Sequence, residues 1–187
     1  GGTRQAIFFT DRNTLGLDVA TGRILWVNYK VNNNTANIAT PVVSGSRVFL
    51  SSAYDTGAVL LDLDPSGATQ VYYTREMMNH YSTSVLVGDY LYGHGDPGWV
   101  CQELKTGKEM WMFRDFGKGA VGCADGMLYC VEEATGNVVL VEASPKGWKE
   151  SGRFKLLRAN ARFVDAHTVR LEDGQRLTSQ CFVLSTG

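Results

Sequence analysis

The chain has 187 residues, 44% of them hydrophobic and 20% charged, with a formal net charge of −1. This composition excludes intrinsic disorder, and the charge gives no electrostatic basis for binding nucleic acid. No apolar run approaches the roughly 18–20 residues of a membrane-spanning helix. The length fits one domain, or one domain with a small appendage.

Short runs rich in Val, Leu, Tyr and Phe follow one another along the chain and are separated by Gly, Asp, Ser and Asn, a pattern typical of strands and turns. The strands expected on this basis are 5–10, 15–19, 39–43, 47–52, 58–63, 71–73, 83–87, 90–93, 99–104, 118–123, 127–132 and 138–143, and the turn 144–147 ends the series. No amphipathic helical period persists. The sequence therefore predicts an all-β protein.

One turn motif recurs. The stretches 16–26 and 101–111 both contain an acidic residue, Thr-Gly, a basic residue and a final Trp, 130–140 is a degraded copy in which Leu140 replaces the Trp, and 61–67 is a weaker one. The motif residues are Asp18, Thr21, Gly22 and Trp26; Glu103, Thr106, Gly107 and Trp111; and Glu132, Thr135 and Gly136. The acidic side chain can accept hydrogen bonds from turn amides, glycine allows a positive φ, and the Trp can pack on the next copy. We therefore interpret the acidic residues as turn architecture.

A second repeated element gives the period. Apolar pairs at 8–9, 48–49, 91–92 and 128–129 recur at steps of about 37 to 43 residues, the spacing of four-stranded propeller blades. A β-sandwich is the all-β alternative, but it gives no reason for a repeated Thr-Gly-x-x-x-Trp motif. The sequence therefore predicts a partial β-propeller of about four blades.

The stretches 85–93, 98–107, 117–121 and 141–150 resemble the PQQ-like, quinoprotein-type β-propeller repeats of bacterial exported proteins, and the resemblance covers about residues 5–155. It implies either a binding scaffold, as in the propeller lipoprotein of the outer-membrane barrel-assembly machinery, or part of a quinoprotein dehydrogenase. A dehydrogenase would hold PQQ with calcium in a shell of oxygen ligands. Its adjacent cysteines are absent here, and the chain has about half of the usual blades, so we expect no bound cofactor.

Residues 157–187 differ in kind. They contain two strands around a His-Thr corner, a hairpin turn at Asp173-Gly174 and an apolar run that ends in Ser185-Thr-Gly187. This segment resembles part of the FAD-dependent pyridine-nucleotide disulfide reductases. The Gly-x-Gly-x-x-Gly loop and the redox cysteine pair of those enzymes are missing, so we expect no flavin binding. The expected organisation is a propeller over 1–155 and a C-terminal β-meander over 156–187.

The four cysteines, Cys101, Cys123, Cys130 and Cys181, form no CxxC pair and have no His at ligand spacing. Cys101 and Cys130 hold the first position of the motif, where another copy has Gly16. We interpret them as small buried residues of inner strands.

Two stretches could contact a ligand. His94, Asp96 and Trp99 lie in a glycine-rich loop, and propeller loops line the faces at which ligands bind. The competing and favoured interpretation is a turn in which Asp96 caps local amides. His80 lies in an aromatic and methionine-rich stretch, 72–81, whose alternative role is packing between blades. No residue is predicted to be catalytic, to bind a cofactor or to bind a metal.

The leading prediction is a non-catalytic binding or scaffold module of a periplasmic or otherwise exported bacterial protein, and the alternative is a fragment of an oxidoreductase. Its partner would be a protein or a small molecule. The chain begins Gly1-Gly2 without a signal-peptide pattern, so we expect an internal segment of a longer protein. A partial ring leaves its end blades uncovered, and we expect the chain to self-associate or to need further blades.

Overall fold

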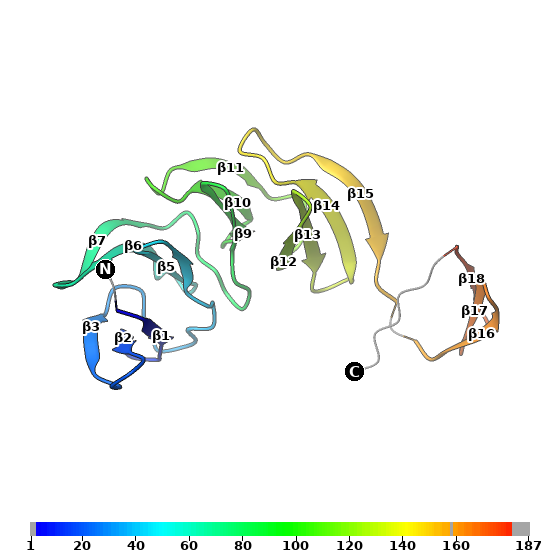
Figure 1. Ribbon diagram of the computed structural model, residues 1–187. Coiled ribbons are helices and arrows are strands. Elements are labelled where there is room, and N and C mark those ends of the chain that lie inside the picture. Colours follow the sequence, from blue (N-terminus) through cyan, green and yellow to red (C-terminus); the bar gives the residue numbers. More distant parts are fainter. Residues whose placement is uncertain (1–2, 158, 181–187) are drawn as a thin grey trace. The chain divides into compact units, whose positions relative to one another are not determined.

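A computed structural model describes residues 3–157 and 159–180 (Figure 1). These residues form 18 strands and no helix, so none of them belongs to a helix that could cross a bilayer. The all-β prediction is confirmed. The chain divides into two compact units, Gly1–Lys155 (unit 1) and Leu156–Gly187 (unit 2), and each is described by itself.

Unit 1 consists of four antiparallel sheets, which we call blades 1 to 4. Blade 1 comprises β1 (Gln5–Phe9), β2 (Thr14–Asp18) and β3 (Ile24–Asn28). Blade 2 comprises β4 (Val42–Ser44), β5 (Arg47–Ser52), β6 (Gly57–Asp64) and β7 (Gly67–Thr74). Blade 3 comprises β8 (Val85–Val87), β9 (Tyr90–His94), β10 (Trp99–Glu103) and β11 (Glu109–Phe113). Blade 4 comprises β12 (Gly119–Ala124), β13 (Met127–Glu132), β14 (Asn137–Glu142) and β15 (Glu150–Lys155).

Within each blade every strand pairs only with its sequence neighbours, and Figure 1 shows the blades following one another in chain order. The core consists of three hydrophobic clusters, and each lies between two successive blades. The sheets do not close on one another. The prediction of a partial propeller of about four blades is confirmed, with blade 1 represented by three strands.

The repeated apolar pairs serve two neighbours at once. Val48 lies in the cluster shared with blade 1, whereas the adjacent Phe49 lies in the cluster shared with blade 3. Leu91 and Tyr92 divide in the same way between blades 2 and 4. Because successive side chains of a strand point to opposite faces, each pair gives one residue to the preceding blade and one to the following blade.

A register shift occurs at the same place in all four blades, between the last two strands. The three strands of blade 1 therefore correspond to the second, third and fourth strands of the other blades. The third-strand residues just before the shift are Gly16, Leu60, Cys101 and Leu140. Their fourth-strand partners are Trp26, Tyr72, Trp111 and Gly152. These four positions are therefore structural counterparts. A ring facing the next blade occupies this position in blades 1 to 3, and a glycine occupies it in blade 4.

This strand pairing shows that the stretch 130–140 does not occupy the same place in its blade as the other two copies of the turn motif. The turn that contains Gly136 joins the second and third strands of blade 4, whereas those with Gly22 and Gly107 join the third and fourth strands of blades 1 and 3. Leu140 is thus the counterpart of Cys101, and the prediction that it replaces the Trp is wrong. The acidic–Thr-Gly turn is local chemistry that can close any hairpin, so its spacing alone does not identify the hairpin.

The prediction that blade 4 ends at the turn 144–147 is also wrong, because β15 follows as its fourth strand. Its sequence ESGRFK contains a single large apolar side chain, Phe154, and is exposed along most of its length. An edge strand of this kind has no alternating apolar pattern, since it buries little of its surface.

Unit 2 is a three-stranded antiparallel sheet of β16 (Ala161–Asp165), β17 (Thr168–Leu171) and β18 (Arg176–Thr178). Gly174 has a φ of 86° in the turn between β17 and β18, as the Asp-Gly pair predicts. The expected Ser185-Thr-Gly187 turn and Cys181 lie outside the described residues.

Candidate functional site

The topology of a blade brings distant loops to one end. In an antiparallel four-stranded sheet, the turn after the second strand lies where the first strand begins and the fourth strand ends. The connections between blades therefore share this end with the second hairpins, and we call it the second-hairpin end. It carries the turn 53–56 of blade 2, the turn 95–98 of blade 3, the turn 133–136 of blade 4 and the connectors 75–84 and 114–118.

His80 links three of these segments. Its Nε2 lies 2.6 Å from the hydroxyl of Tyr54 in the blade 2 turn, and its Nδ1 lies 2.8 Å from Nζ of Lys118 in the next connector. The ammonium of Lys118 can only donate, so Nδ1 accepts and the neutral imidazole carries its proton on Nε2, which donates to Tyr54. One imidazole thus joins a turn and two connectors.

Tyr81 lies beside this pair. The ammonium of Lys118 is 4.9 Å from the centroid of the Tyr81 ring, and His80 meets the ring edge-on at 5.5 Å. Burial, with a smaller contribution from the nearby carboxylate of Glu133, raises the pKa of Tyr81 to about 12. The phenol therefore stays protonated at neutral pH, and its surroundings combine a cation, an aromatic face and a carboxylate.

His94 lies at the end of β9 and is 9% exposed. Its ring meets Trp99 edge-on, with centroids 5.4 Å apart. Burial lowers the pKa of His94 to about 4, and the charge of Lys118 acts in the same direction, against the opposing charge of Asp96. The imidazole is therefore neutral at physiological pH.

A buried hydrogen-bond network holds the connector 75–84 in place. Ser51 Oγ donates to the Met77 carbonyl at 2.7 Å and accepts from the Asn79 amide at 2.8 Å. Asn79 Nδ2 donates to the His94 carbonyl at 3.1 Å, and Ser84 Oγ donates to Asn79 Oδ1 at 2.8 Å. Because these groups are buried and paired, they fix the connector between blades 2 and 3. His80 follows Asn79 directly and is thereby positioned.

The four residues that the sequence suggested as ligand contacts lie in different surroundings. His80 and His94 both interact with Lys118 at the second-hairpin end. Asp96 is exposed in the adjacent turn. Trp99 is 2% exposed and belongs to the core between blades 3 and 4, where its Nε1 donates to the Gly117 carbonyl at 3.0 Å. A ligand at this end would therefore meet His80 and Asp96 but not the buried ring of His94 or the indole.

Sequence reasoning missed Tyr54, Lys118 and Glu133 as members of this cluster. They come from the second hairpins of blades 2 and 4 and from the connector after blade 3, so no local motif joins them. A signal could have come from topology alone: once four-stranded blades are assumed, every second hairpin and connector is assigned to one end.

The repeated acidic residues close their turns. Asp18 Oδ1 accepts from the amides of Ala20 at 2.8 Å and Thr21 at 3.1 Å. The carboxylates of Glu103 and Glu132 instead accept from the hydroxyls of the threonines three residues later, Thr106 and Thr135. The two lengths of acidic side chain thus support the same turn through different donors.

The described residues contain no cluster of side chains typical of a metal site. Among residues 3–157 and 159–180, no group of three or more His, Cys, Asp and Glu side chains is arranged so that it could hold a metal ion. Calcium bound with a quinone needs several oxygen ligands at one point. We therefore derive no chemistry through such a cofactor.

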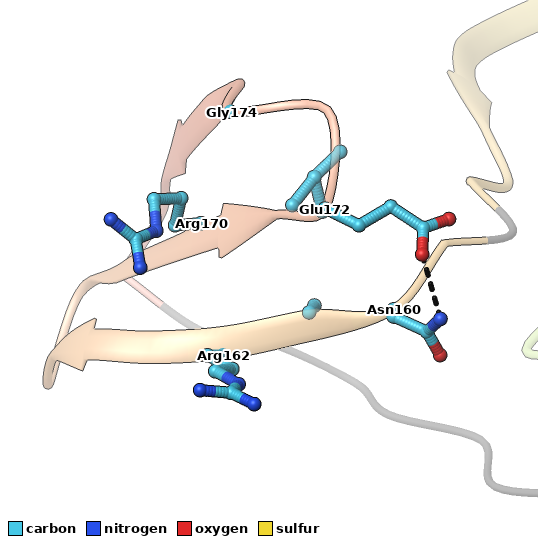
Figure 2. Close-up of a pocket in the computed structure, with 7 residues that line it drawn as sticks. Asn160, Arg162, Arg170, Glu172 and Gly174 are labelled. Atoms are coloured by element: carbon cyan, nitrogen blue, oxygen red, sulfur yellow. Dashed lines mark hydrogen bonds between the residues drawn. The ribbon is translucent and has the colours of Figure 1, made fainter.

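Unit 2 has a surface pocket whose polar side chains do not converge on one point. It is lined by Asn160, Arg162, Arg170 and Glu172, and Figure 2 shows Asn160 Nδ2 paired with Glu172 Oε2, at 2.7 Å. The two arginines face each other across β16 and β17. In Figure 2 their guanidinium groups lie apart from the Asn160–Glu172 pair, so the polar groups do not meet at one point.

Comparison with known proteins identifies the repeats. Residues 1–140 match the family model described as "Outer membrane protein assembly factor BamB", which is built on PQQ-type repeats. The chain belongs to this family. No curated protein matches it in sequence.

Two designed proteins of known structure share the fold at low identity. The computationally designed Ika8 protein is 14% identical with a TM-score of 0.56, over 91% of this chain and 56% of Ika8. The designed Ika4 protein is 11% identical with a TM-score of 0.50, over 85% of this chain and 98% of Ika4. A europium-containing methanol dehydrogenase aligns over 58% of this chain and 23% of its own, at 15% identity and a TM-score of 0.48. This chain thus spans about half of Ika8 and under a quarter of the dehydrogenase.

Proposed function

We propose that this chain is a non-catalytic binding or scaffold module of an exported bacterial protein, and that it contacts its partner at the second-hairpin end. The observation that carries the proposal is the bridge from Tyr54 through His80 to Lys118, which joins one blade turn and two connectors. Polar and aromatic groups from several loops meet there on a fixed framework, as in binding sites built on propeller loops.

The family supports the class of function and the location. Its model is described by the name of an outer membrane protein assembly factor. By analogy, this chain binds a protein or a small molecule in the periplasm or another exported location. The groups at the second-hairpin end are those of a recognition surface: a cation over an aromatic ring, the His80 imidazole and two nearby carboxylates.

Site-specific photocrosslinking tests where the partner binds. A benzoylphenylalanine placed at Asp96 reports on the second-hairpin end, and one placed at Lys105 reports on the third-hairpin turn of blade 3 at the opposite end. Both positions are exposed. In periplasmic extract of a Gram-negative bacterium, we expect a discrete crosslinked product from position 96 that is lost in the Tyr54→Phe, Lys118→Ala double variant. A product from position 105 alone, or one unchanged by the double variant, would contradict the proposal.

Two titrations test the oxidoreductase alternative. The purified chain is titrated with PQQ in the presence of calcium, and separately with FAD, while ligand absorbance and tryptophan fluorescence are followed. We expect no saturable change at micromolar ligand. Saturable binding of either cofactor would replace the scaffold by a fragment of a quinoprotein dehydrogenase or a flavin disulfide reductase.

A further inference from the structure

Three side chains of the second-hairpin end form a relay of hydrogen-bond donors. Lys118 Nζ lies 2.8 Å from His80 Nδ1, and His80 Nε2 lies 2.6 Å from the Tyr54 hydroxyl. An ammonium can only donate, so Nδ1 accepts, the ring carries its proton on Nε2, and the Tyr54 oxygen accepts that proton. The proton of the Tyr54 hydroxyl therefore points away from His80.

The end of this relay is open. Among residues 3–157 and 159–180, the Tyr54 hydroxyl has no hydrogen-bond partner other than His80, and the side chain is 47% exposed. The relay thus begins at a cation and ends at an exposed O–H. Because each hydrogen bond polarises the next, a relay that begins at an ammonium makes its last O–H a stronger donor.

The backbone of the turn that carries Tyr54 is in an uncommon conformation. Tyr54 and Asp55 are its two central residues, and their φ angles of 56° and 60° lie in the left-handed region. Turns of this shape favour Asn and Gly, and a bulky residue such as Tyr is uncommon there. The first hairpins of blades 2 and 3 place glycines, Gly45 and Gly88, at the same φ. Strained positions of this kind cluster at functional sites, which directs attention to Tyr54.

Two side chains from the end of blade 2 hold this turn. Tyr73 Oη donates to the Thr56 carbonyl at 2.6 Å, and Arg75 Nη2 donates to the Asp55 carbonyl. Two successive carbonyls of the turn are therefore fixed from outside it. The direction of the Tyr54 side chain is fixed with them, by the backbone on one side and by His80 on the other.

The charges around the turn suit a negatively charged acceptor. Arg75 contacts the turn and interacts with the carboxylate of Asp55, so it offsets the one acidic side chain of the turn. Lys118 adds a second cation at the start of the relay. The carboxylates of Asp96 and Glu133 belong to other turns, those of blades 3 and 4.

We infer that the Tyr54 hydroxyl is a specificity-determining donor of the proposed site and that it binds a carboxylate of the ligand. The inference rests on the proposed function, because it names the chemistry that the second-hairpin end recognises. A hydrogen bond from the O–H to a carboxylate is about twice as strong as one to a neutral acceptor. A C-terminal carboxylate and an acidic side chain supply the same group, so the test includes both.

Matched probes test the preference for a carboxylate. The chain is titrated with N-acetylglycine, with its neutral amide, and with N-acetylaspartyl methylamide, which carries a side-chain carboxylate. The resonances of the His80 ring protons report binding, since the ring is bonded to Tyr54. We expect a saturable shift with one or both carboxylates and none with the neutral amide. The probe that binds more tightly identifies the source of the carboxylate.

Two variants test the relay itself. Tyr54→Phe keeps the ring and removes the O–H, so the affinity for the carboxylate probe should fall by at least about tenfold, the loss of one hydrogen bond to a charged group. Lys118→Met keeps a long side chain and removes the cation, so it should also weaken binding. Tyr29→Phe is the matched control, since Tyr29 is 70% exposed and lies outside the relay. It should bind as the wild type does, and far-UV circular dichroism of all variants should be unchanged.

An equal shift with the neutral amide, or an undiminished affinity of Tyr54→Phe, would overturn the inference. Photocrosslinking at position 96 separates this failure from that of the proposed function. A crosslinked partner without a preference for carboxylates would refute only the role of Tyr54. Binding of the carboxylate probe without a crosslinked partner would instead support the role of Tyr54 and contradict the proposed partner site.

Discussion

The ring of Phe113 stacks on the ring of Trp148, with centroids 4.4 Å apart and planes 10° from parallel. Phe113 belongs to the last strand of blade 3, and Trp148 lies in the turn before the last strand of blade 4. Trp148 also contacts Trp99, Trp111 and Phe116. A single loop side chain thus completes the aromatic packing between the two blades.

Trp148→Ala should lower the free energy of unfolding by less than the roughly 3–5 kcal/mol of a fully buried Trp, because it removes a large side chain that is only partly buried but stacks on the aromatic cluster. The loss should appear as a lower midpoint in urea, followed by circular dichroism. Trp148→Phe keeps a stacking ring and should recover much of the loss. Met110→Ala, at a position 36% exposed on the same strand as Phe113, should change the midpoint little.

Gly16→Ala should be destabilising by roughly 1–3 kcal/mol, since an added Cβ would lie 2.3 Å from Nε1 of Trp26 and force the indole to move. Gly122→Ala is the matched control, because a Cβ there meets nothing within 4 Å and its φ is not positive. Thermal melts of the two variants should therefore diverge. Equal melting temperatures would show that the indole does not cover Gly16.

Stability should fall as the pH drops from about 6.5 toward 4. His94 has a folded-state pKa of about 4, below its unfolded value near 6.5, so between these values the unfolded chain binds more protons and is favoured as the pH falls. Allowing for partial exposure, the loss attributable to His94 is on the order of 1–2 kcal/mol. Urea titrations at a series of pH values measure it.

His94→Phe preserves an aromatic ring against Trp99 and removes the titration, so its unfolding free energy should depend less on pH than that of the wild type in this window. Nuclear magnetic resonance of the His94 ring protons gives the pKa directly. A midpoint near 6.5 would contradict the burial of the ring.

The cysteines should differ in reactivity. Burial raises the pKa of Cys101 to about 11 and that of Cys130 to about 12, whereas Cys123 is exposed on β12. In a Cys181→Ser background, one equivalent of Ellman's reagent should therefore react quickly with the native chain, and Cys123→Ser should abolish that phase. Fast modification of a second thiol would show that a junction between blades opens readily.

The fold could be predicted from the sequence to the level of blades. The repeated pairs such as Val48-Phe49 carry the period, because each must fill two junctions at once. The turn residues were a weaker guide to the position of a hairpin within its blade. The same acidic–Thr-Gly pattern closes the second hairpin of blade 4 at Gly136 and the third hairpin of blade 3 at Gly107. Strand β15 could not be predicted, since an exposed edge strand needs no apolar alternation.

The candidate site was predictable only in part. His80 and His94 were conspicuous as titratable residues in loops, but their common neighbour Lys118 lies 38 residues from His80 in the chain. Trp99 was misleading, because aromatic residues in a glycine-rich stretch suggest a binding loop and here fill the core. A site whose residues come from different blades produces no local sequence motif.

The three hydrophobic clusters have a consequence for how the chain folds. Each is shared by two successive blades, so stability is a sum of nearest-neighbour terms, as in one-dimensional repeat arrays. Folding can then nucleate at any junction and spread along the chain. Amide hydrogen exchange should be slowest in β5, β6, β9 and β10, whose blades have a neighbour on each side, and should quicken toward both ends of the unit as fraying begins there.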